Sequence, residues 1–233
     1  MSTQDVFQLP APVSIPINGA KETLPIGRIF CVGRNYAAHA AEMGVEVDRE
    51  APFYFTKSAS HAVLSGGQAP YPPGTENYHY EMELAIAIGA PAFCIGEEEA
   101  GAVVYGYCCA LDMTRRDLQI RERKKQRPWD LGKDVENGAV FAPITKVENW
   151  TPSPDKKISL QVNGTTRQDA TLGELIWSVE EIISHLSGFY HLRPGDLIMT
   201  GTPAGVGPTN AGDHLIGEVD GLAPVTLRLT ASK

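Results

Sequence analysis

The sequence predicts a strand-rich α+β fold, on three observations. Stretches with strand patterning are many and helix candidates few, and the chain shows no internal repeat or low-complexity linker. Its 233 residues are enough for one large domain, or one domain with a small appendage, around a sizeable core. A hydrophobic content of 42% and a charged content of 21% are typical of a soluble globular protein.

The N-terminal elements come in the order extended segment, strand, helix and loop. Four prolines among the first 25 residues favour an extended arm or a short hairpin over a helix. The stretch RIFCVG, 28–33, is a short buried strand. In RNYAAHAAEMG, 34–44, Asn35 can cap a helix that Gly44 ends. Three prolines and a glycine within 70–74 then predict a surface loop.

The stretch HYEMELAIAIG, 79–89, predicts a strand with two different faces. Its even-numbered residues from 82 to 88 are apolar and form a core face. The other face carries Glu81 and Glu83, roughly 7 Å apart at Cα, followed by two small alanines. We expect this second face to be the wall of a cavity. The alternative is a half-buried strand whose polar face meets water, although glutamate is disfavoured in strands.

The C-terminal half adds two strands, two helices and a hairpin. A buried strand over 103–111 leads through Asp112 into a helical stretch over 113–125. The Asn163-Gly164 pair, between two alternating runs, suits a type I′ hairpin turn.

The clearest helix is predicted over 171–188. Thr171 and Glu174 form a capping-box pattern, an apolar stripe follows, and Gly188 supplies the stop. The stretch GDLIMTGTPAGVG, 195–207, then predicts a strand entering a glycine-rich loop that lacks the G-K-[ST] of nucleotide hydrolases.

Charge and composition exclude several classes of partner. A formal charge of −8 and a pI near 5.3 argue against nucleic-acid binding, which relies on a basic surface. An acidic small molecule stays possible, because a few cations in a cleft can reverse the local field. No run approaches the roughly 18 to 20 apolar residues of a membrane-spanning helix, and the N-terminus lacks a secretory pattern. We therefore expect a cytoplasmic protein whose partners are small molecules or other subunits.

The four cysteines predict no zinc site and no disulfide framework. Cys31, Cys94, Cys108 and Cys109 lie in apolar or glycine-flanked runs without C-x-x-C spacing. We interpret them as reduced core residues of a cytosolic protein.

A third carboxylate completes a candidate metal site with the glutamate pair. Asp112 stands where a buried strand stops, the place where loops assemble sites, although it could instead cap the following helix. Three carboxylates with no Cys or His ligand favour a hard cation, Mg²⁺ or Mn²⁺, and Ca²⁺ would usually recruit more oxygen ligands.

Further candidates flank this group in the sequence. Arg116 and Gln119 share a helix face within a turn of Asp112 and suit a carboxylate or a developing oxyanion. His39 and Glu42, also three apart, form either a surface hydrogen bond or an oriented general base. Nothing local separates a functional from a surface role for Lys133 in LGKD.

Taken together, these stretches resemble the fumarylacetoacetate hydrolase family from about residue 26 to the C-terminus. The motifs that carry the resemblance are VGRNYAAHAAEMG, the E-M-E of the glutamate strand, LDMTRRDLQ, RPWDLGKD and GDLIMTGTPAGVG. The resemblance implies a mixed β-sheet roll with a few short helices, a homodimer and a divalent metal. It divides the chain into an N-terminal arm, 1–25, and a catalytic domain, 26–233.

The resemblance also implies a role for each candidate. The metal ligands would be Glu81, Glu83 and Asp112, the water-activating pair His39 and Glu42, and the catalytic lysine Lys133. Substrate would be bound by Arg116, Gln119 and Thr202. In relatives the His-Glu helix can belong to a lid, and the polar segment 44–52 would suit that role here.

Within the family, PAPVSIPI, MTRRDLQ and RPW look most like the fumarylpyruvate hydrolases of gentisate-type aromatic degradation. This implies metal-dependent hydrolysis of a carbon–carbon bond in an acylpyruvate, giving fumarate and pyruvate. One departure is that many relatives continue the lysine motif as GK-x-F-D, whereas this chain reads GKDVENGAVFAPI, which we expect to alter the wall beside Lys133.

Two alternatives remain at this stage. Some relatives decarboxylate oxaloacetate, or decarboxylate or isomerise hydroxymuconate-type acids. A non-enzymatic metal- or ligand-binding protein on the same fold would be expected to lose the histidine or the lysine, and both are present here.

Overall fold

The computed structural model describes residues 6–7, 10–42, 44 and 49–232. Its largest sheet has eight strands and is mixed in direction. Seven of them run in the spatial order β4 (Phe53–Lys57), β3 (Ile29–Gly33), β15 (Leu197–Met199), β8 (Met82–Ile88), β9 (Val104–Asp112), β11 (Ala139–Phe141) and β5 (Ala62–Leu64). The eighth, β12 (Thr145–Lys146), pairs with β9 beside β11.

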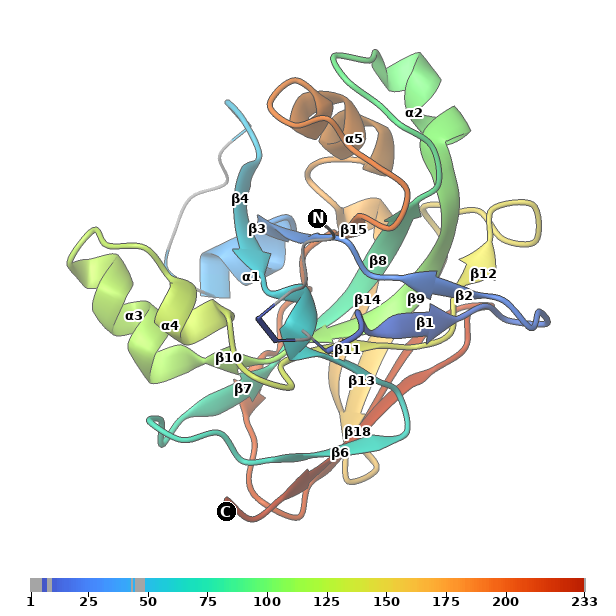
Figure 1. Cartoon of the computed structure of the whole chain (residues 1–233). Helices are drawn as coiled ribbons and strands as arrows, with labels where there is room; N and C mark the ends of the chain where they lie inside the picture. The colour runs from blue at the N-terminus through green and yellow to red at the C-terminus, as the bar shows by residue number, and fades with distance from the viewer. Residues whose placement is uncertain (1–5, 8–9, 43, 45–48, 233) are drawn as a thin grey trace.

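A second sheet of five strands packs against the first. It contains β14 (Thr165–Thr171), β13 (Lys157–Val162), β17 (His214–Val219), β18 (Val225–Thr230) and β6 (Gly67–Pro70), in that spatial order. Two smaller sheets are the pair β1 (Ser14–Pro16) with β2 (Thr23–Pro25), and β10 (Thr114–Arg115) with β7 (Tyr78–Tyr80) and β16 (Gly207–Pro208). The long β8–β9 pair lies at the centre of the molecule (Figure 1).

The helices are short and lie at the periphery (Figure 1). Helix α2 (Glu97–Val103) contacts α5 (Val179–Ser187), and α3 (Arg116–Lys124) contacts α4 (Asp130–Lys133). Helix α1 (Ala37–Glu42) follows β3, and 3₁₀ turns occupy Ala59–His61 and Leu172–Glu174. The predicted strand-rich α+β fold is confirmed. Within the described residues, none of the helices has the length and apolar character that crossing a membrane requires.

The two faces of β8 contact two different cores. Met82 and Leu84 pack in the larger core with side chains of the second sheet such as Leu160 and Leu227. Ala85 and Ala87 are fully buried in a smaller core with side chains of β3, β9 and the β1–β2 hairpin. The expectation that this whole face forms the wall of a cavity is therefore wrong for Ala85 and Ala87, whereas Glu81 and Glu83 do line a cavity.

The expected strand over 79–89 is interrupted at Glu81. Strand β7 ends at residue 80 and β8 starts at residue 82, while the Glu81 carbonyl accepts a hydrogen bond from the Asp112 N–H at 2.9 Å. The hairpin turn is confirmed, since Asn163 and Gly164 have φ of 51° and 78°, as a type I′ turn requires.

The predicted helix over 171–188 is wrong in its first half. The Thr171 and Glu174 capping box is present, but it closes only a 3₁₀ turn, and Leu175 is extended. Helix α5 begins after Ser178, which accepts a hydrogen bond from the Glu181 N–H at 3.2 Å. The reason is a tertiary contact between this segment and Asn35.

Asn35 interrupts that segment instead of capping α1. Its side-chain oxygen accepts from the Trp177 N–H at 2.7 Å, and its amide donates to the carbonyls of Trp177 at 3.0 Å and Thr200 at 2.8 Å. The predicted cap at Asn35 is therefore wrong, because its polar groups bind two distant segments.

Two smaller predictions are also corrected. Cys94 is exposed, whereas Cys31, Cys108 and Cys109 are buried as expected. The helix after Asp112 starts at Arg116, because Thr114 and Arg115 first pair with β7.

Candidate active site

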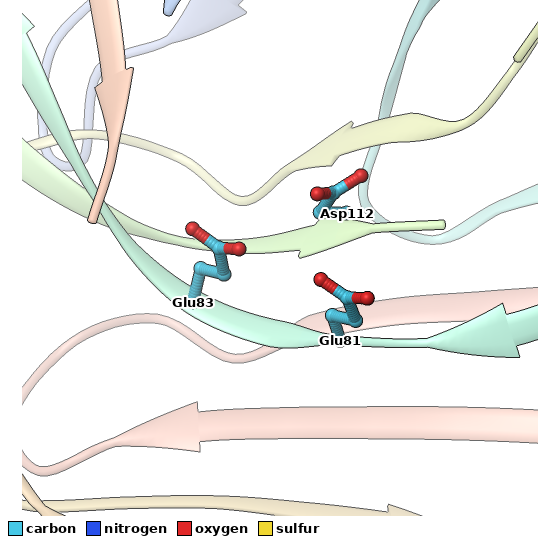
Figure 2. A group of neighbouring side chains, drawn as sticks. All are labelled: Glu81, Glu83 and Asp112. Carbon is cyan, nitrogen blue, oxygen red and sulfur yellow. The ribbon is translucent and has the colours of Figure 1, made fainter. Parts of the chain in front are cut away.

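Three buried carboxylates meet where β8 begins and β9 ends. Glu81 precedes β8, Glu83 is its second residue and Asp112 is the last residue of β9 (Figure 2). One ligand oxygen from each lies within 4.8 Å of the others, and all three residues are at most 4% exposed. Since α3 starts four residues later, Asp112 is not its N-cap, and that alternative is wrong.

Two buried lysines form ion pairs with two of the carboxylates, Glu81 and Asp112. The Lys133 ammonium donates to Glu81 Oε2 and Asp112 Oδ2, both at 2.7 Å, and to Thr114 Oγ1 at 2.9 Å. Burial favours a neutral amine, but the Asp112 and Glu81 charges outweigh it and raise the Lys133 pKa. Lys57 Nζ lies 2.8 Å from Asp112 Oδ1 and also donates to the Lys133 carbonyl.

Sequence reasoning missed Lys57. It is the last residue of β4, a strand whose sequence FYFTK shows no spacing to the other candidates. Only the pairing of β4 with β3 brings it to the site. Glycine at position 132 similarly lets α4 approach α3, since a Cβ there would lie 2.8 Å from the Gln119 backbone nitrogen.

Arg116 links Glu81 to two further polar side chains. Its guanidinium donates to Glu81 Oε1 and to Gln119 Oε1, and its Nε lies 3.4 Å from His79 Nδ1. Burial alone would raise the Glu81 pKa, but Lys133 and Arg116 lower it well below its ordinary value. Glu81 is therefore an ionised carboxylate.

His79 is a neutral imidazole that sequence reasoning also missed. Burial, and then the Arg116 charge, lower its pKa to about 4. Its Nε2 lies 2.8 Å from Asn77 Oδ1, so the neutral tautomer donates from Nε2 and accepts from Arg116 at Nδ1. Because residues 79, 81 and 83 share a face in a strand pattern, the periodicity could have found it.

Glu83 differs from Glu81 in its surroundings. It accepts a hydrogen bond from the Gly201 N–H at 2.6 Å. Burial, followed by the charges of Asp112 and Glu81, raises its pKa well above the ordinary value. A cation placed among the three carboxylates would relieve this repulsion.

His39 and Glu42 form a hydrogen-bonded pair on α1. His39 Nδ1 lies 3.1 Å from Glu42 Oε2, and the Gly205 N–H donates to the same carboxylate at 3.2 and 3.3 Å. The His39 side chain is 7% exposed. With Nδ1–H donated to Glu42, Nε2 carries the lone pair that a general base needs.

Thr202 is held from the second sheet. Its hydroxyl oxygen accepts a hydrogen bond from Gln168 Nε2 at 2.8 Å, so its own O–H is able to donate elsewhere.

One cavity of about 30 Å³ collects most of the candidate residues. Its lining includes His39, Glu81, Glu83, Arg116, Gln119, Lys133 and Thr202. Glu42 and Asp112 stand behind this lining, bonded to His39 and Lys133 respectively. The fold thus brings together residues that span more than 160 positions of the sequence.

The carboxylate group fits a divalent cation. All three side chains offer oxygen ligands, which hard cations prefer. A cation bound among them would also reduce the repulsion of Glu83 by Asp112 and Glu81. Glu81, Glu83 and Asp112 are the residues that would hold it.

Val135 stands in this chain where many relatives have the phenylalanine of GK-x-F-D, and it is fully buried among core side chains. The expected effect of this departure on the wall beside Lys133 stays a prediction. The expected lid over 44–52 includes residues 45–48, which lie outside the described residues, and its role stays a prediction.

The chain is similar in sequence to proteins of known family. The family model described as "Fumarylacetoacetate (FAA) hydrolase C-terminal" matches residues 28–230. A fumarylpyruvate hydrolase of a Ralstonia species is 52% identical over 187 residues, 79% of this chain and 97% of that protein. A mitochondrial oxaloacetate tautomerase of Arabidopsis thaliana is 39% identical over 201 residues, 85% of this chain and 88% of that protein.

Solved structures agree with this relationship. The crystal structure of fumarylpyruvate hydrolase from Pseudomonas aeruginosa, in complex with Mn²⁺ and pyruvate, matches with a TM-score of 0.95 at 45% identity. The match covers 98% of this chain and 100% of that one.

Proposed function

The chain belongs to the fumarylacetoacetate hydrolase family of enzymes, and on this premise we propose that it hydrolyses the carbon–carbon bond of an acylpyruvate. The proposed substrate is fumarylpyruvate, and the products are fumarate and pyruvate. One observation carries the proposal: a single cavity is lined by a paired histidine, a buried lysine and two carboxylates of a cation-binding group. The fumarylpyruvate hydrolase relatives support it.

In the proposed mechanism, His39 activates water. Glu42 accepts the Nδ1 proton and orients the ring, so that Nε2 removes a proton from water as its oxygen bonds to the acyl carbonyl carbon. The Gly205 N–H holds the Glu42 carboxylate in place.

Cationic and amide side chains bind the charges that develop. Arg116, Gln119 and Lys133 line the cavity and stabilise the oxyanion or hold the substrate carboxylate. A divalent cation, held by Glu81, Glu83 and Asp112, would act as a Lewis acid toward the α-keto acid.

The proposed bond cleavage balances without a further reactant. The oxyanion collapses to a carboxylic acid, the bond to the pyruvyl methylene breaks, and its electron pair leaves with pyruvate as the enolate. The enolate carbon then takes up the proton that His39 removed from water. The net reaction consumes one water and yields fumarate and pyruvate.

The proposal includes the metal, the oligomeric state, the cellular location and the pathway. We favour Mg²⁺ or Mn²⁺, because oxygen-only donors suit both and a relative's crystal structure contains Mn²⁺. The resemblance to fumarylpyruvate hydrolases supports a homodimer in the cytoplasm that acts in gentisate-type aromatic degradation.

The test is a parallel assay of the purified protein with Mg²⁺ or Mn²⁺ on fumarylpyruvate, acetylpyruvate and oxaloacetate. We expect loss of the diketone absorbance with equimolar pyruvate and fumarate. Turnover of oxaloacetate alone would overturn the hydrolase proposal.

A second candidate is keto–enol conversion of oxaloacetate, which the tautomerase relative favours. It needs the same α-keto acid site and a proton-transferring group, but no attacking water. A change in enol absorbance without loss of total oxaloacetate would support it, whereas CO₂ release would indicate a decarboxylase.

A further inference from the structure

A larger pocket continues outward from the candidate active site. It has a volume of about 610 Å³. Four residues, Arg34, Phe55, Trp129 and Lys133, line both this pocket and the small cavity at the carboxylates. These four residues therefore form a neck, the junction between the outer pocket and the small cavity, through which an elongated substrate would extend.

The outer pocket is aromatic with a cationic component. Its rings are Phe30, Phe53, Tyr54, Phe55, Trp129 and Tyr190. Its charged members besides Lys133 are Arg34, Arg127 and a single acid, Asp130. Such a lining suits a planar, unsaturated group that carries a negative charge.

Arg34 occupies an unusual backbone conformation at the neck. It follows β3 and has a φ of 57°, a left-handed conformation that is rare for residues other than glycine. Such a conformation persists only where the surrounding structure imposes it.

Two aromatic rings hold the Arg34 guanidinium. Its Cζ lies 5.4 Å from the centre of the Phe53 ring and 5.8 Å from that of Trp129. The two rings meet edge to face at 5.3 Å, and Phe53 packs so closely on Gly33 that a Cβ there would overlap it. Stacking on aromatic rings is compatible with the planar, bidentate way in which arginine recognises carboxylates.

We propose that Arg34 is the specificity-determining residue that binds the distal carboxylate of a dicarboxylic acyl chain. The chain's planar carbon skeleton then lies against Phe55 and Trp129 in the neck. This inference rests on the proposed function, which places the α-keto acid end at the three carboxylates. Arg127 lies in the same pocket but reaches outward, with a side chain that is 63% exposed and 3.9 Å from Glu122.

The kinetic test compares two substrates that differ at the distal end. Fumarylpyruvate carries a carboxylate there, and acetylpyruvate carries none. A charge-assisted hydrogen bond is worth roughly 10- to 100-fold in binding. We expect Arg34→Gln in the Mn²⁺-loaded protein to lower kcat/KM for fumarylpyruvate by about that factor, mainly through KM, and to leave acetylpyruvate within about threefold.

Variants control for charge, fold and position. Arg34→Lys keeps the charge and should recover part of the loss, which shows that the site still folds. Arg228→Gln removes one positive charge from an exposed position of β18 and should leave both substrates unchanged. Loss of selectivity in Arg127→Gln but not in Arg34→Gln would overturn the assignment, as would an equal loss for both substrates in Arg34→Gln.

A binding measurement keeps the inference testable without turnover. Fumarate and crotonate share a planar four-carbon chain, but crotonate has a methyl group in place of one carboxylate. Calorimetric titration should show fumarate binding more tightly than crotonate to the wild type, and this preference should vanish in Arg34→Gln. If Arg34→Gln kept the preference for fumarate, the role of Arg34 would be overturned, whether or not the wild type hydrolyses an acylpyruvate. If the wild type hydrolysed no acylpyruvate, that result by itself would contradict only the proposed function.

Discussion

At the scale of single residues, His39 is the side chain on which the proposed hydrolysis depends most. It lines the cavity, and its Nδ1 is held by Glu42. We expect His39→Ala to lower kcat by roughly 10²- to 10⁴-fold, because a general base contributes about that much. Pyruvate release measures the loss.

Metal binding separates this role from damage to the site. Since His39 is not among the three carboxylates, calorimetry should give the same Mn²⁺ affinity for His39→Ala as for the wild type. Unchanged turnover of fumarylpyruvate by the variant would remove the general-base assignment.

His79 makes stability depend on pH. Its folded pKa of about 4 lies below the ordinary value of about 6.5, chiefly through burial and then through Arg116. Between these two pH values the unfolded chain binds more protons than the folded chain does. The contribution of His79 to the free energy of unfolding is therefore complete above about pH 6.5 and is lost as the pH falls toward 4. A shift of this size corresponds to about 3 kcal/mol, and partial exposure reduces it to about 1–2 kcal/mol.

The measurement is the urea midpoint of metal-free protein from pH 7 to pH 4. We expect His79→Gln to flatten this dependence relative to the wild type, while His214→Gln, a half-buried histidine of β17, controls for the substitution. Parallel curves for His79→Gln and the wild type would contradict the prediction.

At the scale of elements, Asn35 joins three segments that are distant in sequence. Its buried side chain bonds the backbone at Trp177 and Thr200, and its own carbonyl accepts from the Ile176 N–H at 2.8 Å. This contact also explains why the apolar periodicity of 171–188 does not produce one helix. Local capping and periodicity favour a helix there, but the hydrogen bonds to Asn35 keep residues 175–177 outside any helix, and Leu175 is extended.

We expect Asn35→Ala to lower the free energy of unfolding by about 2–4 kcal/mol, because buried backbone groups would lose their partners. Chemical denaturation measures this change. Asn149→Ala, at an exposed position, should change stability by about 0.5 kcal/mol or less. A similarly small effect of Asn35→Ala would show that these hydrogen bonds contribute little.

At the scale of the whole molecule, the candidate metal site joins the central strands β8 and β9 to α4. A cation that binds only the folded state stabilises it by RT ln(1 + [M]/Kd), about 2.7 kcal/mol at a hundredfold excess over Kd. We expect Mn²⁺ to raise the thermal midpoint of EDTA-treated protein and to have little effect on Glu83→Gln. An equal rise in both proteins would place metal binding elsewhere.

Several features of the fold and the family could be predicted from sequence patterns alone. Strand alternation predicted the core face of β8, and the Asn163-Gly164 pair predicted the hairpin of β13 and β14. The combined motifs indicated the family that the comparisons then showed. These features depend on contacts between neighbours in the chain or on motifs whose order is visible in it. The roles of the nine candidate residues, and the division into an arm and a catalytic domain, stay predictions.

Contacts between residues that are distant in the sequence depend on the three-dimensional fold. Lys57 reaches Asp112 through the pairing of β4 with β3, Asn35 stops a helix from more than 130 residues away, and Arg34 meets Trp129 at the neck. None of these contacts is visible in the local sequence, because each residue is compatible with its own strand, turn or loop whether or not its distant partner is present. The hydrogen bonds, ion pairs and cation–π contacts between such partners form only when the sheet folds and excludes water from between the partners. Sequence patterns therefore cannot reveal these interactions.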